Sequence, residues 1–94
     1  MSRRSGCARD LEHKGEKYIR ISVKIEEGKI REVYIRGDFF CYPEDAIERL
    51  EKALVGRRPE EIPEVFREAM EGVELLGIRK EELLKLISEA STCP

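Results

Sequence analysis

The sequence predicts a small α+β domain in which three helices pack on one face of a small antiparallel sheet. Apolar and polar residues alternate in two neighbouring segments of the N-terminal half, as they do in half-buried strands. Three segments with helical apolar spacing follow, separated by Gly and Pro. Strands that come before helices, rather than alternating with them, are typical of α+β domains, and 94 residues suffice for one domain.

Two strands are predicted from Lys17 to Glu26 and from Arg31 to Arg36, because every second residue in each is apolar. Glu26-Glu27-Gly28 between them predicts a three-residue hairpin loop with Gly28 in the left-handed conformation. The inward face is then formed by Ile19, Ile21, Val23, Ile25, Val33 and Ile35.

A loop centred on Glu27 makes opposed residue numbers sum to 54, which places Ile19 opposite Ile35 and Ile21 opposite Val33. On the outer face the same register sets two aromatic rings beside two guanidinium groups, which attract each other. Tyr and Arg are also enriched in interface hot spots. These pairs are either a docking surface or ordinary cross-strand pairs on an exposed face, and they are Tyr18–Arg36 and Arg20–Tyr34.

A third strand is expected, since a lone hairpin is marginally stable in water. Its candidate sources are residues 10–16 and 73–78. Residues 1–9 are small and polar and are expected to be a flexible N-terminal segment. Residues 10–94 then form a single domain.

Three helices are predicted, from Pro43 to a stop at Gly56, from Pro59 to a stop at Gly72, and from Arg79 to Ala90. Pro suits the first turn of a helix, and Gly suits the position after its end. Each segment carries one apolar stripe, as a helix lying on a sheet does.

Composition excludes several classes of protein. The net charge is −2, which argues against a nucleic-acid partner, and no apolar run is long enough to cross a membrane. The charge is uneven, at +4 over residues 1–36 and −6 over residues 37–94, which favours docking on a polar partner or binding of an anionic small ligand. Asn and Gln are absent, which is typical of thermophile proteins. No secretory signal is visible, and three scattered cysteines suggest neither a zinc site nor a disulfide framework, so a soluble cytoplasmic protein is expected.

No set of residues with the spacing of a catalytic or metal site is found. His13 is the single histidine, and the glycine-rich phosphate-binding patterns are missing. Cys41 is the one cysteine beside a structured motif, where it is either a small apolar residue or a reactive thiol near a helix N-terminus. We therefore expect no catalytic residue, no metal ligand and no cofactor bound by this chain alone.

The segment Gly37-Asp38-Phe39-Phe40 stands out where the hairpin ends. Gly37 permits a close backbone approach or a positive φ, and the Asp38 carboxylate is expected to accept hydrogen bonds from amides of the turn. Two adjacent Phe side chains do not readily enter the same core, so we expect one to fill the core and the other to face a partner. A strand-to-helix corner anchored by aromatics is the plainer interpretation.

The run Gly28–Phe40 (GKIREVYIRGDFF), the pair Pro43-Glu44 and the run Leu50–Gly56 (LEKALVG) resemble the C-terminal accessory domain of lipoate–protein ligases. That family shows G-x-I-x-x-V-x-I-x-G-D-F-F at a hairpin end, then a P-E helix start and an L-E-x-x-L-x-G helix end. Lys14-Gly15-Glu16-Lys17 is similar to its entry into the first strand. The resemblance covers residues 12–90, nearly the whole chain.

This resemblance implies an accessory subunit of a split, archaeal-type ligase that is not an enzyme alone. Its partner would be a separate catalytic chain in a heterodimer, with lipoyl carrier domains as indirect partners. Lipoate, ATP and Mg²⁺ would be bound in the complex, where lipoate is activated to lipoyl-adenylate and passed to a carrier lysine. The fold would be similar to that of iron–sulfur scaffold proteins. The alternative is a sulfur-relay or iron–sulfur scaffold protein that uses Cys41.

Overall fold

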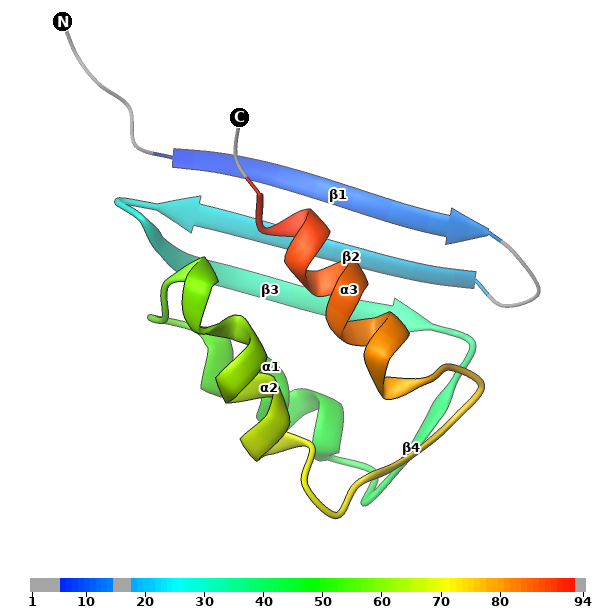
Figure 1. Cartoon of the computed structure of the whole chain (residues 1–94). Coiled ribbons are helices and arrows are strands. Elements are labelled where there is room, and N and C mark those ends of the chain that lie inside the picture. The colour runs from blue at the N-terminus through cyan, green and yellow to red at the C-terminus, as the bar shows by residue number, and fades with distance from the viewer. Residues whose placement is uncertain (1–5, 15–17, 93–94) are drawn as a thin grey trace, which may run out of the picture.

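The computed structural model of the chain describes residues 6–14 and 18–92. Five strands, three α-helices and a short 3₁₀ helix are found in these residues (Figure 1). The strands are β1 (Gly6–Lys14), β2 (Tyr18–Glu26), β3 (Lys29–Gly37), β4 (Phe40–Tyr42) and β5 (Glu74–Leu76). The helices are α1 (Ala46–Leu54), η1 (Pro59–Glu61), α2 (Ile62–Ala69) and α3 (Lys80–Ala90).

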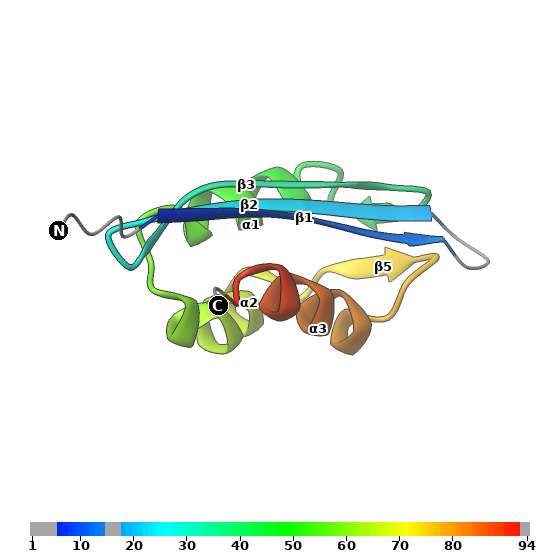
Figure 2. The ribbon, with the colours of Figure 1, turned by 90° about the horizontal axis from the view of Figure 1, so that it is seen from above.

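The main sheet is antiparallel in the order β1-β2-β3, which confirms the predicted α+β class. Seen along its edge, the sheet has α2 and α3 on one face, whereas α1 lies beside β3 at the level of the sheet (Figure 2). The prediction that all three helices pack on one face is therefore wrong for α1. The core between these layers includes Ile21, Ile30, Leu50, Leu54, Ile62, Met70, Leu83 and Ile87, all almost fully buried.

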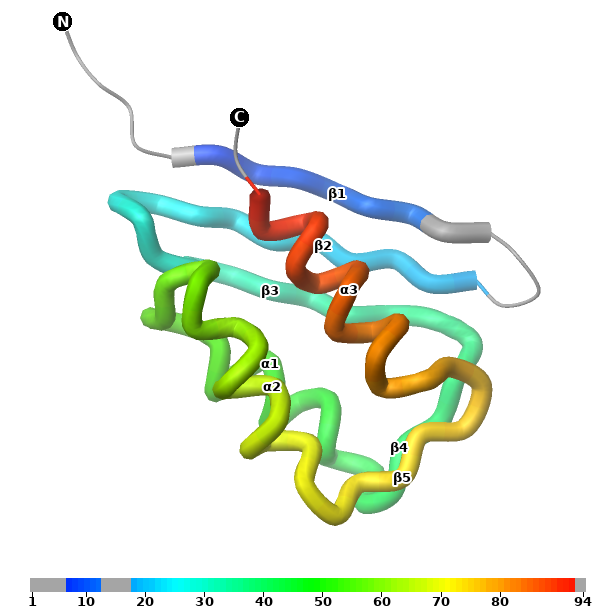
Figure 3. The backbone as a smooth tube through the Cα atoms, in the orientation of Figure 1, coloured from blue at the N-terminus to red at the C-terminus, as the bar shows by residue number. Residues whose placement is uncertain are grey.

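The third strand comes from the N-terminal segment and is longer than predicted. β1 begins at Gly6 and pairs with β2 along its whole length. Residues 6–9 are thus strand residues rather than part of a flexible segment, and residues 1–5 lie outside the described residues. The other candidate segment is also extended, because β5 pairs with β4 in a separate two-stranded ribbon outside the main sheet (Figure 3).

The β2–β3 hairpin has a different register from the predicted one. Its loop has two residues, Glu27 and Gly28, both with positive φ, as a tight type I′ turn requires. Arg31 is an extra residue on β3, which forms a bulge there. Because loop and bulge together shift the register by two residues, Ile21 faces Ile35 rather than Val33. A shift of two keeps each side chain on its face, so all six residues of the predicted inward face are buried.

The first helix starts later than predicted. The Tyr42–Pro43 peptide bond is cis, and α1 begins at Ala46, whose amide donates a hydrogen bond to the Pro43 carbonyl oxygen (N–O 3.0 Å). Pro43 thus lies in the turn before the helix and not in its first turn. The second and third helical segments agree with the prediction, with η1 leading into α2 and Arg79 as the N-terminal cap residue of α3.

Helix α1 covers the outer edge of β3. The Ile35 amide donates a hydrogen bond to Glu51 Oε2 (2.8 Å), and the Glu51 side chain is only 17% exposed. Further along, the Ile30 amide donates to the Arg57 carbonyl oxygen (2.8 Å), and the Gly56 amide donates to the Ile30 carbonyl oxygen (2.7 Å). These bonds satisfy strand groups that would otherwise be left unpaired at the edge.

Cys7 is disulfide-bonded, whereas Cys41 is a free thiol. Three scattered cysteines were not expected to form a disulfide framework, but one disulfide is present at Cys7. Within the described ranges, no helix is long and apolar enough to cross a membrane.

Candidate docking surface

The predicted corner motif begins with a very close backbone contact. A Cβ atom on Gly37 would lie 2.6 Å from the Tyr18 carbonyl oxygen, well inside the contact distance of any real side chain. The Asp38 amide donates a hydrogen bond to the same oxygen (2.9 Å). Gly37 is therefore required for a close approach between β3 and the start of β2, and not for a positive φ.

The two phenylalanines of the motif point in different directions, as predicted. Phe39 is partly buried and packs against the core, whereas the Phe40 side chain is 74% exposed. Gly77, with φ at +105°, lies against this corner, because a Cβ there would be 3.1 Å from the Asp38 carbonyl oxygen. The β4–β5 ribbon is thus held tightly at the end of β3.

Phe40 belongs to an apolar group on the outer face of the ribbon. In the antiparallel register, Phe40 lies opposite Leu76, and Tyr42 lies opposite Glu74 on the same face. Tyr42 is 72% exposed and Leu76 is 65% exposed, and both were missed in the sequence. The signal that could have found Leu76 is the pair of adjacent leucines in β5. Adjacent residues of a strand point to opposite faces, so only one of the two can face the core.

On the outer face of the main sheet, Tyr18 and Arg20 bond to β1 rather than to β3. The Tyr18 hydroxyl donates to Glu12 Oε2 (2.7 Å), and Arg20 Nη2 pairs with Asp10 Oδ2 (3.3 Å). Hydrogen bonds from Ser22 and then Arg20 lower the pKa of Asp10, whereas the bond to Glu12 raises the pKa of Tyr18. The same ion pair raises the pKa of Arg20. The predicted pairs Tyr18–Arg36 and Arg20–Tyr34 are wrong, because Arg20 faces Arg36 and Tyr34 faces Ser22.

Arg36 still stacks on an aromatic ring, but on its own strand. Its guanidinium carbon lies 5.6 Å from the centre of the Tyr34 ring. Arg36 Nη1 also lies 3.5 Å from Glu51 Oε2 and donates to the Ile35 carbonyl oxygen (3.0 Å). Both guanidinium groups of this face, those of Arg20 and Arg36, therefore have partners within the chain.

The Asp38 carboxylate does not have its predicted role. Its side chain is exposed and makes no hydrogen bond or ion pair within residues 6–14 and 18–92; only the backbone amide is bonded. We therefore expect Asp38→Ala to change the free energy of unfolding by no more than about 0.5 kcal/mol, as at other surface positions. Chemical denaturation of both proteins measures this. A loss above 1 kcal/mol would mean that the carboxylate satisfies buried amides after all.

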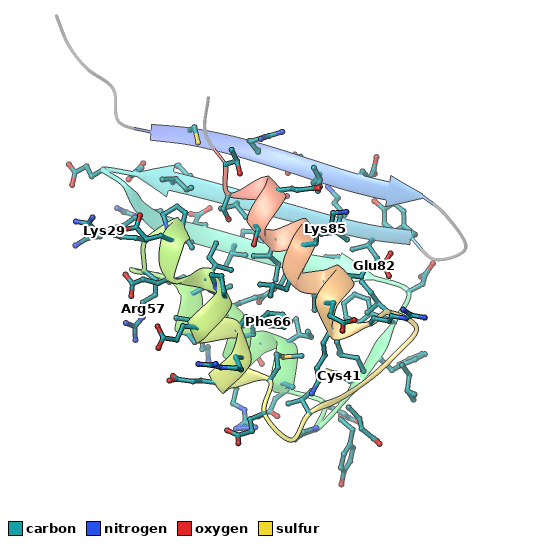
Figure 4. All side chains as sticks on the ribbon, viewed as in Figure 1. Lys29, Cys41, Arg57, Phe66, Glu82 and Lys85 are labelled. Carbon is teal, nitrogen blue, oxygen red and sulfur yellow. The ribbon has the colours of Figure 1, made fainter. Side chains whose placement is uncertain are left out.

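Cys41 lies on β4, partly buried, with its thiol donating weakly to the Glu44 carbonyl oxygen (3.4 Å) (Figure 4). It faces inward, beside Leu75 of β5.

Among the described residues, no group of three or more His, Cys, Asp or Glu side chains is placed to hold a metal ion. A groove of about 800 Å³ between α2 and α3 is lined by Phe66, Met70 and Leu84 beside several charged residues.

Fold and surface together define a small α+β domain with an exposed apolar ribbon. Comparisons with known proteins agree with this class. The family described as the bacterial lipoate protein ligase C-terminus matches residues 16–87. Lipoate-protein ligase A subunit 2 of Thermoplasma acidophilum is 34% identical over 70 residues, which cover 73% of this chain and 74% of that protein.

A solved structure is similar over almost the whole fold. It comes from work on an archaeal lipoylation system, described as a bi-partite lipoate protein ligase and its E2 lipoyl domain from Thermoplasma acidophilum. The TM-score is 0.74 at 28% sequence identity, and the match covers 90% of this chain and 97% of that chain. The chain belongs to the family of lipoate protein ligase C-terminal domains.

Proposed function

We propose that this chain is the accessory subunit of a two-chain lipoate–protein ligase and acts by docking on a separate catalytic chain. Its family membership and its likeness to subunit 2 of the Thermoplasma acidophilum ligase carry this proposal. The exposed ribbon supports it, since three large apolar side chains on one face favour contact with another protein.

In the proposed heterodimer, lipoate, ATP and Mg²⁺ are substrates and ligands of the assembled ligase, and a lysine of a lipoyl carrier domain accepts the lipoyl group. The accessory chain contributes by completing or closing the site of its partner, as mobile lids and domains do in other enzymes. A cytoplasmic location, a thermophilic source and a likeness to iron–sulfur scaffold proteins remain predictions.

The test is lipoate-dependent release of pyrophosphate from ATP, measured for this chain, for the catalytic ligase chain of the same organism, and for their mixture. We expect release only from the mixture, because the accessory chain is inert and its partner needs it for activation. Omitting lipoate gives the background rate. Full activity of the catalytic chain by itself would contradict the proposal.

The sulfur-relay alternative is not supported by the comparisons, and a substitution at Cys41 distinguishes it from the ligase proposal. Cys41→Ser should leave activation of the partner within about twofold of the original protein, because ligation needs no thiol from this chain. Pyrophosphate release in the mixture measures the effect, and circular dichroism confirms that the variant is folded. Loss of activity in a folded variant, together with a persulfide on Cys41 by mass spectrometry, would favour the alternative.

A further inference from the structure

We propose that the outer face of the β4–β5 ribbon, formed by Phe40, Tyr42 and Leu76, is the surface that binds the catalytic chain. Its partner surface would be an apolar recess with Lys or Arg side chains at its rim. This inference rests on the proposed function and names the contact surface for it.

The three side chains form one patch rather than scattered exposed residues. Phe40 and Leu76 are directly opposed across the ribbon, and Tyr42 follows on the same face. Each is about two-thirds or more exposed, whereas the alternate residues Cys41 and Leu75 pack against the core. Aromatic side chains in a cluster of this kind are typical of interface hot spots.

The ribbon is held in place before any partner arrives. Gly37 lies against the Tyr18 carbonyl oxygen, and Gly77 lies against the Asp38 carbonyl oxygen and Phe39. Phe39 packs on the core directly before Phe40. A surface that is already ordered loses little conformational entropy on binding, so its apolar contacts contribute more fully to affinity.

Charge at the ribbon selects the kind of partner. Asp38 and Glu44 flank β4, and Glu74 lies on the ribbon face; all three are exposed, and none has an ion-pair partner within the described ranges. Among the described residues within three positions of β4 or β5, Arg79 is the one Lys or Arg. The balance is acidic, which favours a basic rim on the partner.

The same charges argue against other occupants. A symmetric contact with a second copy would place these acidic flanks against each other, which is unfavourable. Nucleic acids and anionic lipid surfaces would be repelled for the same reason. A separate protein with apolar and basic groups remains the occupant that fits.

The other candidate surface, the outer face of the main sheet, fits a partner less well. Arg20 is paired with Asp10, and Arg36 contacts both Glu51 and the Tyr34 ring. A partner that used these guanidinium groups would first have to break bonds within the chain. On the ribbon, by contrast, the exposed apolar groups and the carboxylates have no competing partners among residues 6–14 and 18–92.

The experiment measures the dissociation constant for the catalytic ligase chain of the same organism by calorimetry. We expect Phe40→Ala to weaken binding about 30-fold and Leu76→Ala about tenfold, as hot-spot truncations do. Glu74→Lys should also weaken binding, and the loss should shrink as salt is raised, because salt screens the attraction. Val55→Ala is the matched control: Val55 is exposed at the end of α1, outside the ribbon, and should bind as the original chain does.

Circular dichroism of each variant separates lost binding from lost folding. If Phe40→Ala and Leu76→Ala both bind the catalytic chain with the affinity of the original chain, the ribbon is not the docking surface. That result would leave the proposed function standing. Weakening by Tyr34→Ala in place of the ribbon variants would assign docking to the sheet face instead. A homodimer, seen by sedimentation, that Phe40→Ala dissociates would overturn the proposed occupant. Absence of binding by the original chain would overturn both proposals.

Discussion

Gly37→Ala should destabilise the domain by about 3 kcal/mol, which corresponds to a fall of roughly 12–24 °C in melting temperature for a domain of this size. The added methyl group would sit 2.6 Å from the Tyr18 carbonyl oxygen, which is a backbone atom and cannot rotate away. Moving that oxygen would also break its hydrogen bond from the Asp38 amide. The cost of the steric clash and the cost of the lost hydrogen bond add, because pairing in the sheet keeps both strands from moving apart.

Thermal unfolding followed by circular dichroism measures the effect of Gly37→Ala. Gly56→Ala is the matched control: Gly56 has φ at +90° but no atom within 4 Å of an added Cβ, so only backbone strain of about 1–2 kcal/mol is expected. Equal losses at the two positions would mean that the contact between β2 and β3 relaxes and that Gly37 is not required by it.

The second large effect is expected at Phe39. Phe39→Ala should lower the free energy of unfolding by about 2–3 kcal/mol, somewhat less than for a fully buried Phe, because its side chain is only partly buried. Chemical denaturation measures the loss. Phe40→Ala, one residue away and mostly exposed, should change stability by no more than about 0.5 kcal/mol.

The pair separates two roles of adjacent identical side chains. Phe39 stabilises the corner from inside, whereas Phe40 is available for binding. Similar losses of stability at both positions, with no loss of binding at Phe40, would show that the whole motif is a structural anchor.

Periodicity in the sequence predicts which side chains are inside, but not how strands are aligned. Ile21, Val33 and Ile35 are buried as predicted, because a strand with one buried face must alternate. The register failed first at the loop, which has two residues instead of the predicted three, and again at Arg31, since a bulge adds a residue without leaving a compositional signal. The Tyr–Arg pairs failed for that reason, and also because β1 offered Asp10 to Arg20.

Only part of the candidate docking surface could be predicted, because the rest depends on how strands pair. Gly37 and the split between Phe39 and Phe40 follow from local chemistry and could be predicted from the sequence. Tyr42 and Leu76 are 34 residues apart in the chain, and only the pairing of β4 with β5 brings them to one face. Single-sequence patterns do not contain that pairing.

The covering of β3 by α1 also determines where this sheet could grow. Glu51, Gly56 and Arg57 occupy hydrogen-bonding groups of β3, so that side of the sheet offers little to an incoming strand. Among the described strands, β1 is paired with β2 alone. Fibril-like addition of another chain is therefore directed to β1, where Arg9, Asp10 and Glu12 are charged and exposed. Charged edge strands disfavour such addition, and this one edge is where replacing charges with apolar residues should first produce aggregates.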